Sequence, residues 1–431
     1  MNIAYVDPPY SGYFHRLAAL LSQRTGGRTL ALLSSPAYRM YAKGDRSMVW
    51  TPGEPAQRHA LPQSFERAAW AGAGCPDFDR AFSHAVEWLY DRFRDEGTDV
   101  CLLFSDARPF SAAVQVAAQR LGVVCLYFER GAYRYCTASL STQGLNARFD
   151  LAVAQAHQQV HGIAAPPSRR RIEPWLKLRF LAFMLRNELA CRLDKGRRPM
   201  QHKSYHFFNY LRIALRQWRG ERVDLAEASA TRPTVLLPLQ LQTDSQFVLH
   251  SPFHNNQELV DFVVCHVRAE LPDAEVLVKK HPMDVRSYRL PEGSRLIEGN
   301  LSHYFHRALL VVCINSTVGF EAASHGKSVI CFGDSFYTAH PHILRTAPGD
   351  FARQLQSAAR RGDDPDAGRD LKAAVLRHYQ APGDVWAYDE TDLDATAGIV
   401  MQHVRAARNS RRFRQGSGFL DEADDHAVAQ S

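Results

Sequence analysis

Short runs of apolar residues recur along this chain, and each run leads into a polar or glycine-containing loop and then a helical pattern. The runs are continuous rather than alternating, which is typical of parallel strands covered on both faces by helices. They fall into two blocks. The first block has runs near Asn2, Thr98 and Val123, and the second has runs near Thr234, Glu275, Leu309 and Ser328. The sequence therefore predicts an α/β protein with two Rossmann-like, doubly wound domains and a helical segment between them.

The stretch between the two blocks has no strand pattern and carries the excess positive charge of the chain. Residues 168–220 hold 14 Lys and Arg against 3 Asp and Glu, whereas the whole chain has 52 against 45. Arg212, Arg216 and Arg219 share one stripe of a predicted helix. The aromatic residues of this stretch include Trp175, Phe180, Phe183, Phe207, Phe208 and Trp218. Cations beside aromatic side chains suit a helix that lies on an anionic membrane, and a helical bridge between the domains is the alternative.

These patterns predict five parts of the chain. They are a Rossmann-like domain at residues 1–160, a basic helical segment at 161–231, a second Rossmann-like domain at 232–345, helices at 346–408, and a polar, disordered tail at 409–431. No run has the length of a membrane-spanning helix, and the first residues lack the basic region of a signal peptide. The eight cysteines stand singly, without the close pairs of a zinc site. We therefore expect a cytoplasmic protein.

Polar side chains gather where the predicted strands of the second block end, which is where open parallel sheets bind ligands. In chain order these side chains are Gln240 and Gln246, then Lys280 and His281, then Asn315, Ser316 and Thr317. Ser316 and Thr317 would open a helix, whose free N–H groups and dipole favour an anion. Taken singly, a capping hydroxyl and a loop histidine are simpler interpretations. Their combination on neighbouring strands favours a phosphate site.

Glu321 lies about one helical turn beyond Thr317 and could accept both ribose hydroxyls of a nucleotide. The apolar neighbours Phe320 and Ala322 disfavour the alternative of a purely solvated glutamate. Two Asp-x-Asp pairs, at residues 77–79 and 392–394, do not lie at predicted strand ends, and the chain has no P-loop or GxGxxG motif. The sequence therefore predicts no metal ion and no resident cofactor.

Four runs of the chain carry a family resemblance: FERGAYRYCTASLSTQGLN, PLQLQTDSQ with the HSPF after it, VKKHP, and INSTVGFEAASHGKSVICFGDSFY. They resemble the capsule polysaccharide biosynthesis/export family over about residues 125–340. That family includes bacterial transferases that place β-linked Kdo, an eight-carbon acidic sugar, on the lipid terminus of capsules. The His-Pro and Ser-Thr elements are also similar to those with which bacterial CMP-sialic acid transferases hold the CMP phosphate.

The resemblance implies a GT-B type glycosyltransferase, with an acceptor domain first and a CMP-sugar domain second. It matches Asp244 to the catalytic aspartate, Glu129 to an acidic residue that faces the cleft, and His281 with Ser316–Thr317 to the CMP-phosphate grip. CMP-Kdo is β-linked, so a β product means retention, and retention by double displacement needs a carboxylate nucleophile and a second group that moves protons. Asp244 and Glu129 would serve. The alternatives are that Asp244 caps the next helix and that Glu129 pairs with Arg130 or Arg134.

We further expect Gly12, Arg134, Gln240 and Gln246 to contact substrate. The partners implied are a CMP-linked acidic sugar, a lipid acceptor such as phosphatidylglycerol, the anionic cytoplasmic face of the inner membrane, and other capsule assembly and export proteins, without nucleic acid. Two other functions stay open: a non-catalytic capsule export or assembly factor that binds glycolipid, and a sugar-nucleotide epimerase of similar architecture.

Overall fold

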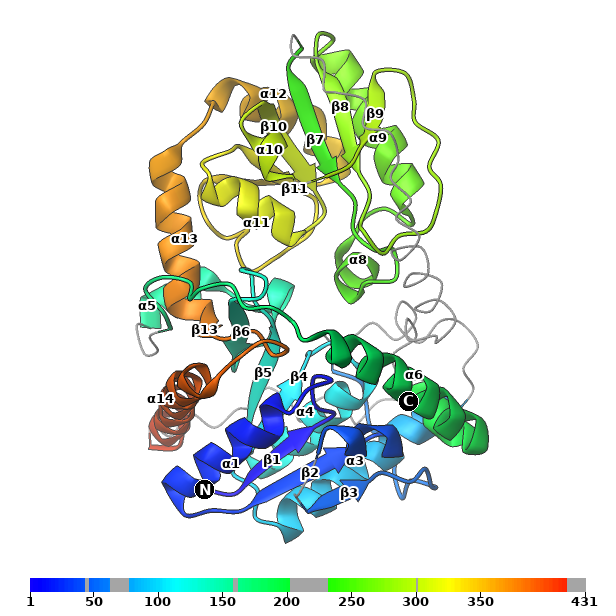
Figure 1. Cartoon of the computed structure of the whole chain (residues 1–431), viewed down its shortest axis with the longest axis vertical. Helices are drawn as coiled ribbons and strands as arrows, with labels where there is room; N and C mark the ends of the chain where they lie inside the picture. Colours follow the sequence, from blue (N-terminus) through cyan, green and yellow to red (C-terminus); the bar gives the residue numbers. More distant parts are fainter. Residues whose placement is uncertain (43–45, 63–76, 158–161, 202–231, 300, 417–431) are drawn as a thin grey trace, which may run out of the picture.

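The computed structural model describes residues 1–42, 46–62, 77–157, 162–201, 232–299 and 301–416. In this part of the chain, two α/β domains lie one above the other, each with a central sheet and helices around it (Figure 1). The predicted fold class is confirmed, because two Rossmann-like domains in one chain make the GT-B type of architecture.

The N-terminal sheet has the strand order β3-β2-β1-β4-β5-β6-β13 within the described residues. Strands β1 to β5 run parallel to their neighbours, whereas β6 is antiparallel to β5, and β13 is antiparallel to β6. The strands are β1 (Ile3–Val6), β2 (Thr29–Leu33), β3 (Ser47–Val49), β4 (Val100–Phe104), β5 (Val124–Arg130), β6 (Thr137–Ser141) and β13 (Gln380–Pro382).

Helices cover both faces of this sheet, because its strands are apolar at successive positions. Ile3 and Tyr5 pack in one buried cluster with α1 and α14, whereas Ala4 and Val6 pack in another with α3 and α4. The helices of this region are α1 (Tyr13–Thr25), α3 (Phe78–Asp95), α4 (Pro109–Leu121), α5 (Leu151–His157) and α6 (Pro174–Leu193), with the 3-10 helices η1 (Pro36–Met40), η2 (Asn146–Arg148) and η3 (Lys195–Met200).

The C-terminal sheet has the order β12-β11-β10-β7-β8-β9, and all its recorded strand pairs are parallel. The strands are β7 (Thr234–Pro238), β8 (Glu275–Lys279), β9 (Ser294–Ile297), β10 (Ala308–Cys313), β11 (Val329–Cys331) and β12 (Ile343–Arg345). The helices are α8 (Ser245–His250), α9 (Asn256–Glu270), α10 (Ser302–Phe305), α11 (Thr317–Ser324), α12 (Phe351–Arg361) and α13 (Pro365–Tyr379), with η4 (Pro348–Asp350).

Both sheets change winding direction at their centre. When the strands of each sheet are numbered from its own first strand, the C-terminal sheet reads 3-2-1-4-5-6, which is the order of doubly wound sheets, and the N-terminal sheet has the same order with β13 added after β6. The switch points lie between β1 and β4 and between β7 and β10. Ligands of such sheets bind beyond the carboxyl ends of the strands at this position, so the loops after β7 and β10 are where a nucleotide is expected.

The end of the chain returns to the N-terminal domain, which the sequence did not predict. β13 joins the N-terminal sheet beside β6, and the Gln380 side chain accepts a 3.0 Å hydrogen bond from the backbone N–H of Ala132. Helix α14 (Glu390–Gly416) then packs against α1. It continues into the part predicted as a disordered tail from Asn409. The correction has a local cause, because Arg and Gln favour helix; residues 417–431 lie outside the described part.

The basic segment is described only in its first part, because residues 202–231, with Arg212, Arg216, Arg219, Phe207, Phe208 and Trp218, lie outside the described residues. Phe183 of α6 is buried and Phe180 is partly buried, so neither side chain is free to enter a bilayer as the membrane prediction required. Their rings lie 4.9 and 5.0 Å from the ring of Tyr10, inside the N-terminal domain. Among the described helices, none combines the length and apolar character needed to cross a bilayer.

Candidate active site

Four of the predicted residues influence one another's ionisation although they come from different domains. They are Glu129 and Arg134 of the N-terminal domain and Asp244 and His281 of the C-terminal domain, and we call them the inter-domain cluster. Asp244 raises the pKa of Glu129, while Arg134 lowers the pKa values of the other three. Such mutual effects require the four groups to lie near one another, where the two domains meet.

Glu129 stands near the end of β5. Its Oε2 atom accepts a 2.6 Å hydrogen bond from the side-chain amide of Asn146. Asn146 begins η2 with a φ of 51°, a left-handed conformation that Asn tolerates better than most residues. Burial, and then the charge of Asp244, raises the pKa of Glu129 to about 7. A carboxyl group with that pKa populates both protonation states at neutral pH, as a general acid or base requires.

A buried carboxylate holds the turn that carries Asn146. Asp106, just after β4, is 3% exposed, and its Oδ2 accepts a 2.9 Å hydrogen bond from the backbone N–H of Leu145. Arg148 donates to the Asp106 carbonyl at 2.9 Å and lies 3.5 Å from the same Oδ2 atom. Asp106 therefore fixes the turn, and the turn presents Asn146 to Glu129.

Arg134 lies in the loop between β5 and β6. Within the described residues, no carboxylate lies at salt-bridge distance from its guanidinium. Burial, and then the nearby charge of Arg130, lowers the pKa of Arg134, while Glu129 and Asp244 counteract that effect. The guanidinium therefore keeps N–H donors for an anionic ligand, and Arg is well suited to bind a carboxylate or phosphate with two parallel hydrogen bonds.

The C-terminal segment clamps the loop that carries Arg134. The fully buried Asp384 accepts hydrogen bonds from Arg130 at 3.0 and 2.9 Å and from the backbone N–H of Tyr135 at 3.1 Å. It also accepts a 2.9 Å bond from the backbone N–H of Trp386. Since Arg130 is bound by Asp384, the alternative in which Arg130 pairs with Glu129 does not hold.

Asp244 enters the cluster from the first turn of α8. Its Oδ1 atom accepts a 2.9 Å hydrogen bond from the backbone N–H of Gln246, so the residue does cap the helix. Helix α8 lies beside η2 of the other domain, which carries Asn146. Part of the Asp244 residue faces solvent. The protein that surrounds its carboxylate nevertheless reduces the hydration of the charged form, and this raises the pKa of Asp244. The cap does not exclude a catalytic role, because it orients the carboxylate and leaves Oδ2 without a recorded hydrogen bond in the described part of the chain.

His281 follows β8 and is held by its own loop. Its Nδ1 atom accepts a 3.1 Å hydrogen bond from the backbone N–H of Met283, which assigns the ring proton to Nε2. Burial and the charge of Arg134 lower the pKa of His281 to about 4, so the neutral ring offers Nε2–H as a donor. Lys280 instead donates to the carbonyl of Arg286 and lies 5.7 Å over the ring of Tyr288. Of the two expected phosphate ligands, Lys280 and His281, only His281 is positioned in the inter-domain cluster in this structure.

The start of α11 fits an anion site. The Ser316 hydroxyl accepts a 3.2 Å hydrogen bond from the backbone N–H of Val318 and still has its own hydrogen to donate. The hydroxyl of Tyr337 donates to the Ser316 carbonyl at 2.6 Å and fixes this turn. Thr317 is the first residue of the helix, where backbone N–H groups lack partners within the helix.

Three predicted amides brace the switch point of the C-terminal sheet. Asn315 is 5% exposed, and its Oδ1 accepts a 3.0 Å hydrogen bond from the side chain of Gln240. Its Nδ2 donates to the carbonyl of Asp334 at 2.9 Å and to the side chain of Gln246 at 3.4 Å. These amides therefore join the loops after β7 and β10, and much of their hydrogen-bonding capacity is used within the protein.

Glu321 lies on α11 beside the contact between the domains. The ring of Tyr133, from the N-terminal domain, packs edge-on against Phe320 at 5.7 Å. Burial raises the pKa of Glu321, and His325 partly offsets this. Gly12 lies apart in the loop after β1, where a β-carbon would meet the Tyr388 hydroxyl at 3.4 Å. Within the described residues, the structure does not join Gly12 to the inter-domain cluster.

The positioning residues were not predicted as site residues. Asn146 lies in the loop that carries the family resemblance, and Asp106 stands just after a buried strand. These positions in the sequence could have identified both residues as candidates for the site. Asp384 offered none, because it is separated from Arg130 by 254 residues of sequence. Asp392, of a discounted Asp-x-Asp pair, binds Arg170 at 2.8 Å. Among the described residues, no three His, Cys, Asp or Glu side chains are arranged to hold a metal ion.

Comparison with known proteins places these residues in a family. The pattern of the family described as "Capsule polysaccharide biosynthesis protein" matches residues 99–341, which include the whole inter-domain cluster and the start of α11. The protein FixF of Sinorhizobium fredii is 36% identical over 137 residues, which is 31% of this chain and 34% of FixF. The chain thus matches about a third of the length of that relative.

Two further comparisons cover more of the chain. The "Capsule polysaccharide export protein KpsS" of Escherichia coli is 26% identical over 307 residues, 62% of this chain and 77% of KpsS. The solved structure of the β-Kdo 2,4 transferase of KpsC from Thermosulfurimonas dismutans is 16% identical, covers 84% of this chain and 94% of its own, and has a TM-score of 0.40. The family match spans more than half of the 431 residues. The chain belongs to the capsule polysaccharide biosynthesis family.

Proposed function

We propose that this protein is a retaining glycosyltransferase that moves Kdo, or a related acidic sugar, from a CMP donor to a lipid-linked acceptor. The observation that carries the proposal is the pairing of two carboxyl groups from opposite domains, Glu129 and Asp244, of which the first has a pKa of about 7. Family membership supports a role in capsule polysaccharide biosynthesis. No metal or resident cofactor takes part in the proposed reaction.

The two carboxyl groups would divide the work of a double displacement. Asp244 attacks the anomeric carbon of the donor, the bond from this carbon to the phosphate oxygen breaks, and CMP leaves with the bonding electrons. An acceptor hydroxyl then attacks the same carbon and displaces Asp244, while its proton passes to Glu129. Two inversions give net retention. Glu129 returns the proton to solvent, so each turnover releases one CMP.

The donor would lie along the carboxyl end of the C-terminal sheet. The Nε2–H group of His281 and the N-terminus of α11, with Ser316 and Thr317, would hold the phosphate of CMP. Glu321, one turn along α11, would accept hydrogen bonds from the ribose. The guanidinium of Arg134, which lacks an ion-pair partner among the described residues, would bind the carboxylate of the acidic sugar. Gln240, Gln246 and Asn315 would shape the floor of this site, and Lys280 would act on the phosphate only after leaving its loop.

The acceptor would enter from the N-terminal domain, past the loop of Gly12. We propose a lipid such as phosphatidylglycerol as the acceptor, at the cytoplasmic face of the inner membrane, with other capsule assembly and export proteins as partners. The name of KpsS as an export protein keeps a second function in view, in which the chain binds glycolipid without catalysis.

A transfer assay tests the proposal. The protein is incubated with CMP-Kdo generated in the reaction and a panel of lipid acceptors, and CMP release and acceptor mass are followed together. We expect CMP release that depends on one lipid and adds the mass of one or more Kdo residues, and the product anomer, read by NMR, should be β. CMP binding without transfer would favour the assembly factor, and interconversion of a UDP-sugar would favour an epimerase.

A further inference from the structure

The outward face of α6 carries a row of exposed apolar side chains, which we call the α6 stripe. It consists of Trp175, Leu178, Leu185, Leu189 and Leu193, whose exposed fractions are 53%, 71%, 53%, 55% and 81%. Spacings of three, four and seven residues keep these positions on one side of an α-helix. Five large apolar residues on one helix face form a contiguous patch of the kind that marks an interaction surface.

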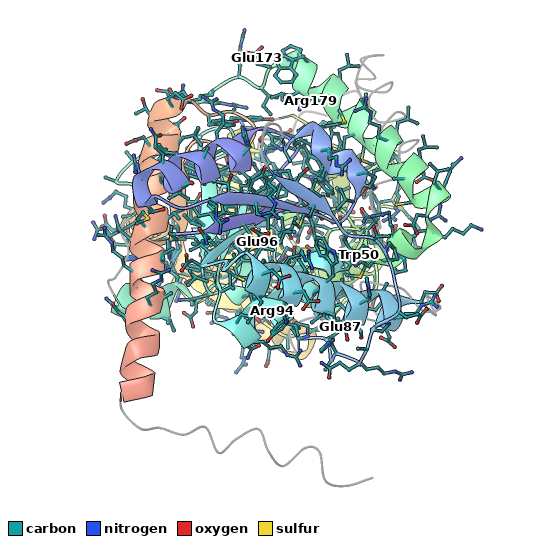
Figure 2. All side chains as sticks on the ribbon, turned by 90° about the horizontal axis from the view of Figure 1, so that it is seen from below. Trp50, Glu87, Arg94, Glu96, Glu173 and Arg179 are labelled. Atoms are coloured by element: carbon teal, nitrogen blue, oxygen red, sulfur yellow. The ribbon has the colours of Figure 1, made fainter. Side chains whose placement is uncertain are left out.

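The opposite face of α6 anchors the helix, so the stripe is not needed to hold it in place. Phe183 and Met184 are 0% and 1% exposed. The hydroxyl of Tyr41 donates a 3.3 Å hydrogen bond to the carbonyl of Arg179, and the Arg179 guanidinium lies 4.6 Å over the Tyr41 ring. Figure 2 shows α6 along the periphery of the N-terminal domain, with Arg179 labelled near its start. A rigid helix therefore presents the stripe.

The charge around the stripe is strongly positive. Residues 174–200 contain seven Lys and Arg against two Asp and Glu. Both acids are paired: Glu188 lies 3.0 Å from Arg192, and Asp194 lies 3.0 Å from Arg197. The remaining exposed cations of this region include Lys177, Arg186 and Lys195. An exposed apolar row flanked by cations has the composition of a helix that lies in the interface of an anionic bilayer.

We propose that the α6 stripe docks this protein on an anionic lipid surface, with the leucines and Trp175 in the headgroup boundary and the flanking cations on the lipid phosphates. Charge selects this occupant over a second copy of the chain, because two such faces would bring like charges together. The docking itself is argued from the α6 stripe, whereas the reason for docking, access to a lipid acceptor, rests on the proposed function. Tyr10, against which α6 packs, lies in the loop after β1, at the carboxyl edge of the sheet where a lipid acceptor is expected.

Vesicle flotation with the full-length protein tests the docking face. Vesicles of phosphatidylcholine alone are compared with vesicles that also contain phosphatidylglycerol, at low and high salt. The variant is Leu185→Gln with Leu189→Gln, which removes apolar surface without changing charge. We expect the wild type to bind only the anionic vesicles and less at high salt, and the variant to lose at least about tenfold in partitioning. Val153→Gln, at an exposed apolar residue of α5 outside the stripe, is the matched control and should bind like the wild type.

Two results would overturn the docking face. One is equal vesicle binding by the double variant and the wild type. Another is a wild type that does not bind vesicles but forms a dimer that the double variant cannot form. If vesicle binding is equal, a lowered melting temperature of the double variant would identify the stripe as an internal contact. Donor and transfer are absent from these measurements, so failure here and failure of the transferase proposal are separate results.

Discussion

The negative charge of Asp244, on the C-terminal domain, raises the pKa of Glu129, on the N-terminal domain. Two neighbouring carboxyl groups do not ionise independently. Asp244 accepts a backbone N–H bond from Gln246 and is assigned the charge, whereas Glu129 retains its proton up to about pH 7. The protonation state of the site therefore depends on how closely the two domains approach.

Glu129→Gln should stabilise the folded protein above pH 7 while it removes transfer. The folded-state pKa of about 7 exceeds the ordinary value of 4.5, so the folded state holds a proton that the unfolded state releases. Stability consequently falls as the pH rises from 4.5 to 7, and the full cost applies above 7. At about 1.4 kcal/mol per pKa unit the cost is at most about 3 kcal/mol, and partial exposure of the side chain reduces it.

Urea unfolding at pH 5 and pH 8 measures this effect. The stability gap between Glu129→Gln and the wild type should be small at pH 5 and favour the variant at pH 8. Glu292→Gln is the control, since this glutamate has a side chain that is 86% exposed. A variant less stable than the wild type at pH 8 would mean that Glu129 is held as a favourable carboxylate and not as a proton carrier.

Asp244→Asn should abolish transfer and leave CMP affinity nearly unchanged. The amide keeps an oxygen that can cap α8, so the fold should persist, but it cannot act as a nucleophile. Turnover is measured by CMP release and affinity by calorimetry. Asp261→Asn, on α9, is the control and should keep activity, because this aspartate binds Arg289 and Gln257 outside the inter-domain cluster. Wild-type turnover by Asp244→Asn would remove the aspartate from the reaction and leave it as a helix cap.

The sequence predicted the sheet strands that carry the site because each is a continuous apolar run, and it predicted the polar strand ends because sheet topology places them together. The sequence did not predict which of these polar side chains are available for a ligand and which are bound within the protein. Lys280 and His281 are adjacent in sequence, yet the loop after β8 turns one toward the Arg286 carbonyl and leaves the other in the inter-domain cluster. The return of the chain at Asp384 was also beyond reach, because a buried ion pair between distant segments has no local pattern.

CMP should raise the melting temperature more than UMP or ADP does. A ligand that binds only the folded state stabilises it by about 2.7 kcal/mol at a hundredfold excess over its dissociation constant. His281→Ala should reduce this shift, because the loss of a hydrogen bond to an ionised phosphate weakens binding by about tenfold or more. His266→Ala, at a histidine on α9, is the matched control. A larger shift with UDP than with CMP would support the epimerase instead.

Arg134→Lys should weaken binding of the acidic sugar more than binding of CMP. A lysine keeps the charge but loses the planar pair of donors that matches a carboxylate. We expect the KM for CMP-Kdo to rise, while inhibition by free CMP changes little. Arg169→Lys is the control, because Arg169 lies over the ring of Tyr135 and outside the inter-domain cluster. Equal losses for donor and for CMP would assign Arg134 to the phosphate rather than to the sugar.

Asp384→Ala should destabilise the protein and disturb the site through the loop that it clamps. The carboxylate is fully buried and binds Arg130 and the N–H groups of Tyr135 and Trp386, so its loss leaves a partly buried guanidinium, 20% exposed, without its carboxylate. Breaking a buried pair in this way costs about 3–5 kcal/mol. Urea unfolding of the full-length protein measures the cost, and Asp91→Ala is the control, because that aspartate pairs with Arg94 on the surface of α3 and should change stability little. Asp384→Asn keeps an acceptor for the backbone N–H groups and should fold better than Asp384→Ala. Its activity then tests the link to Arg134: a folded Asp384→Asn protein with a raised KM for the donor supports the clamp, whereas wild-type kinetics would make Asp384 a contributor to stability alone.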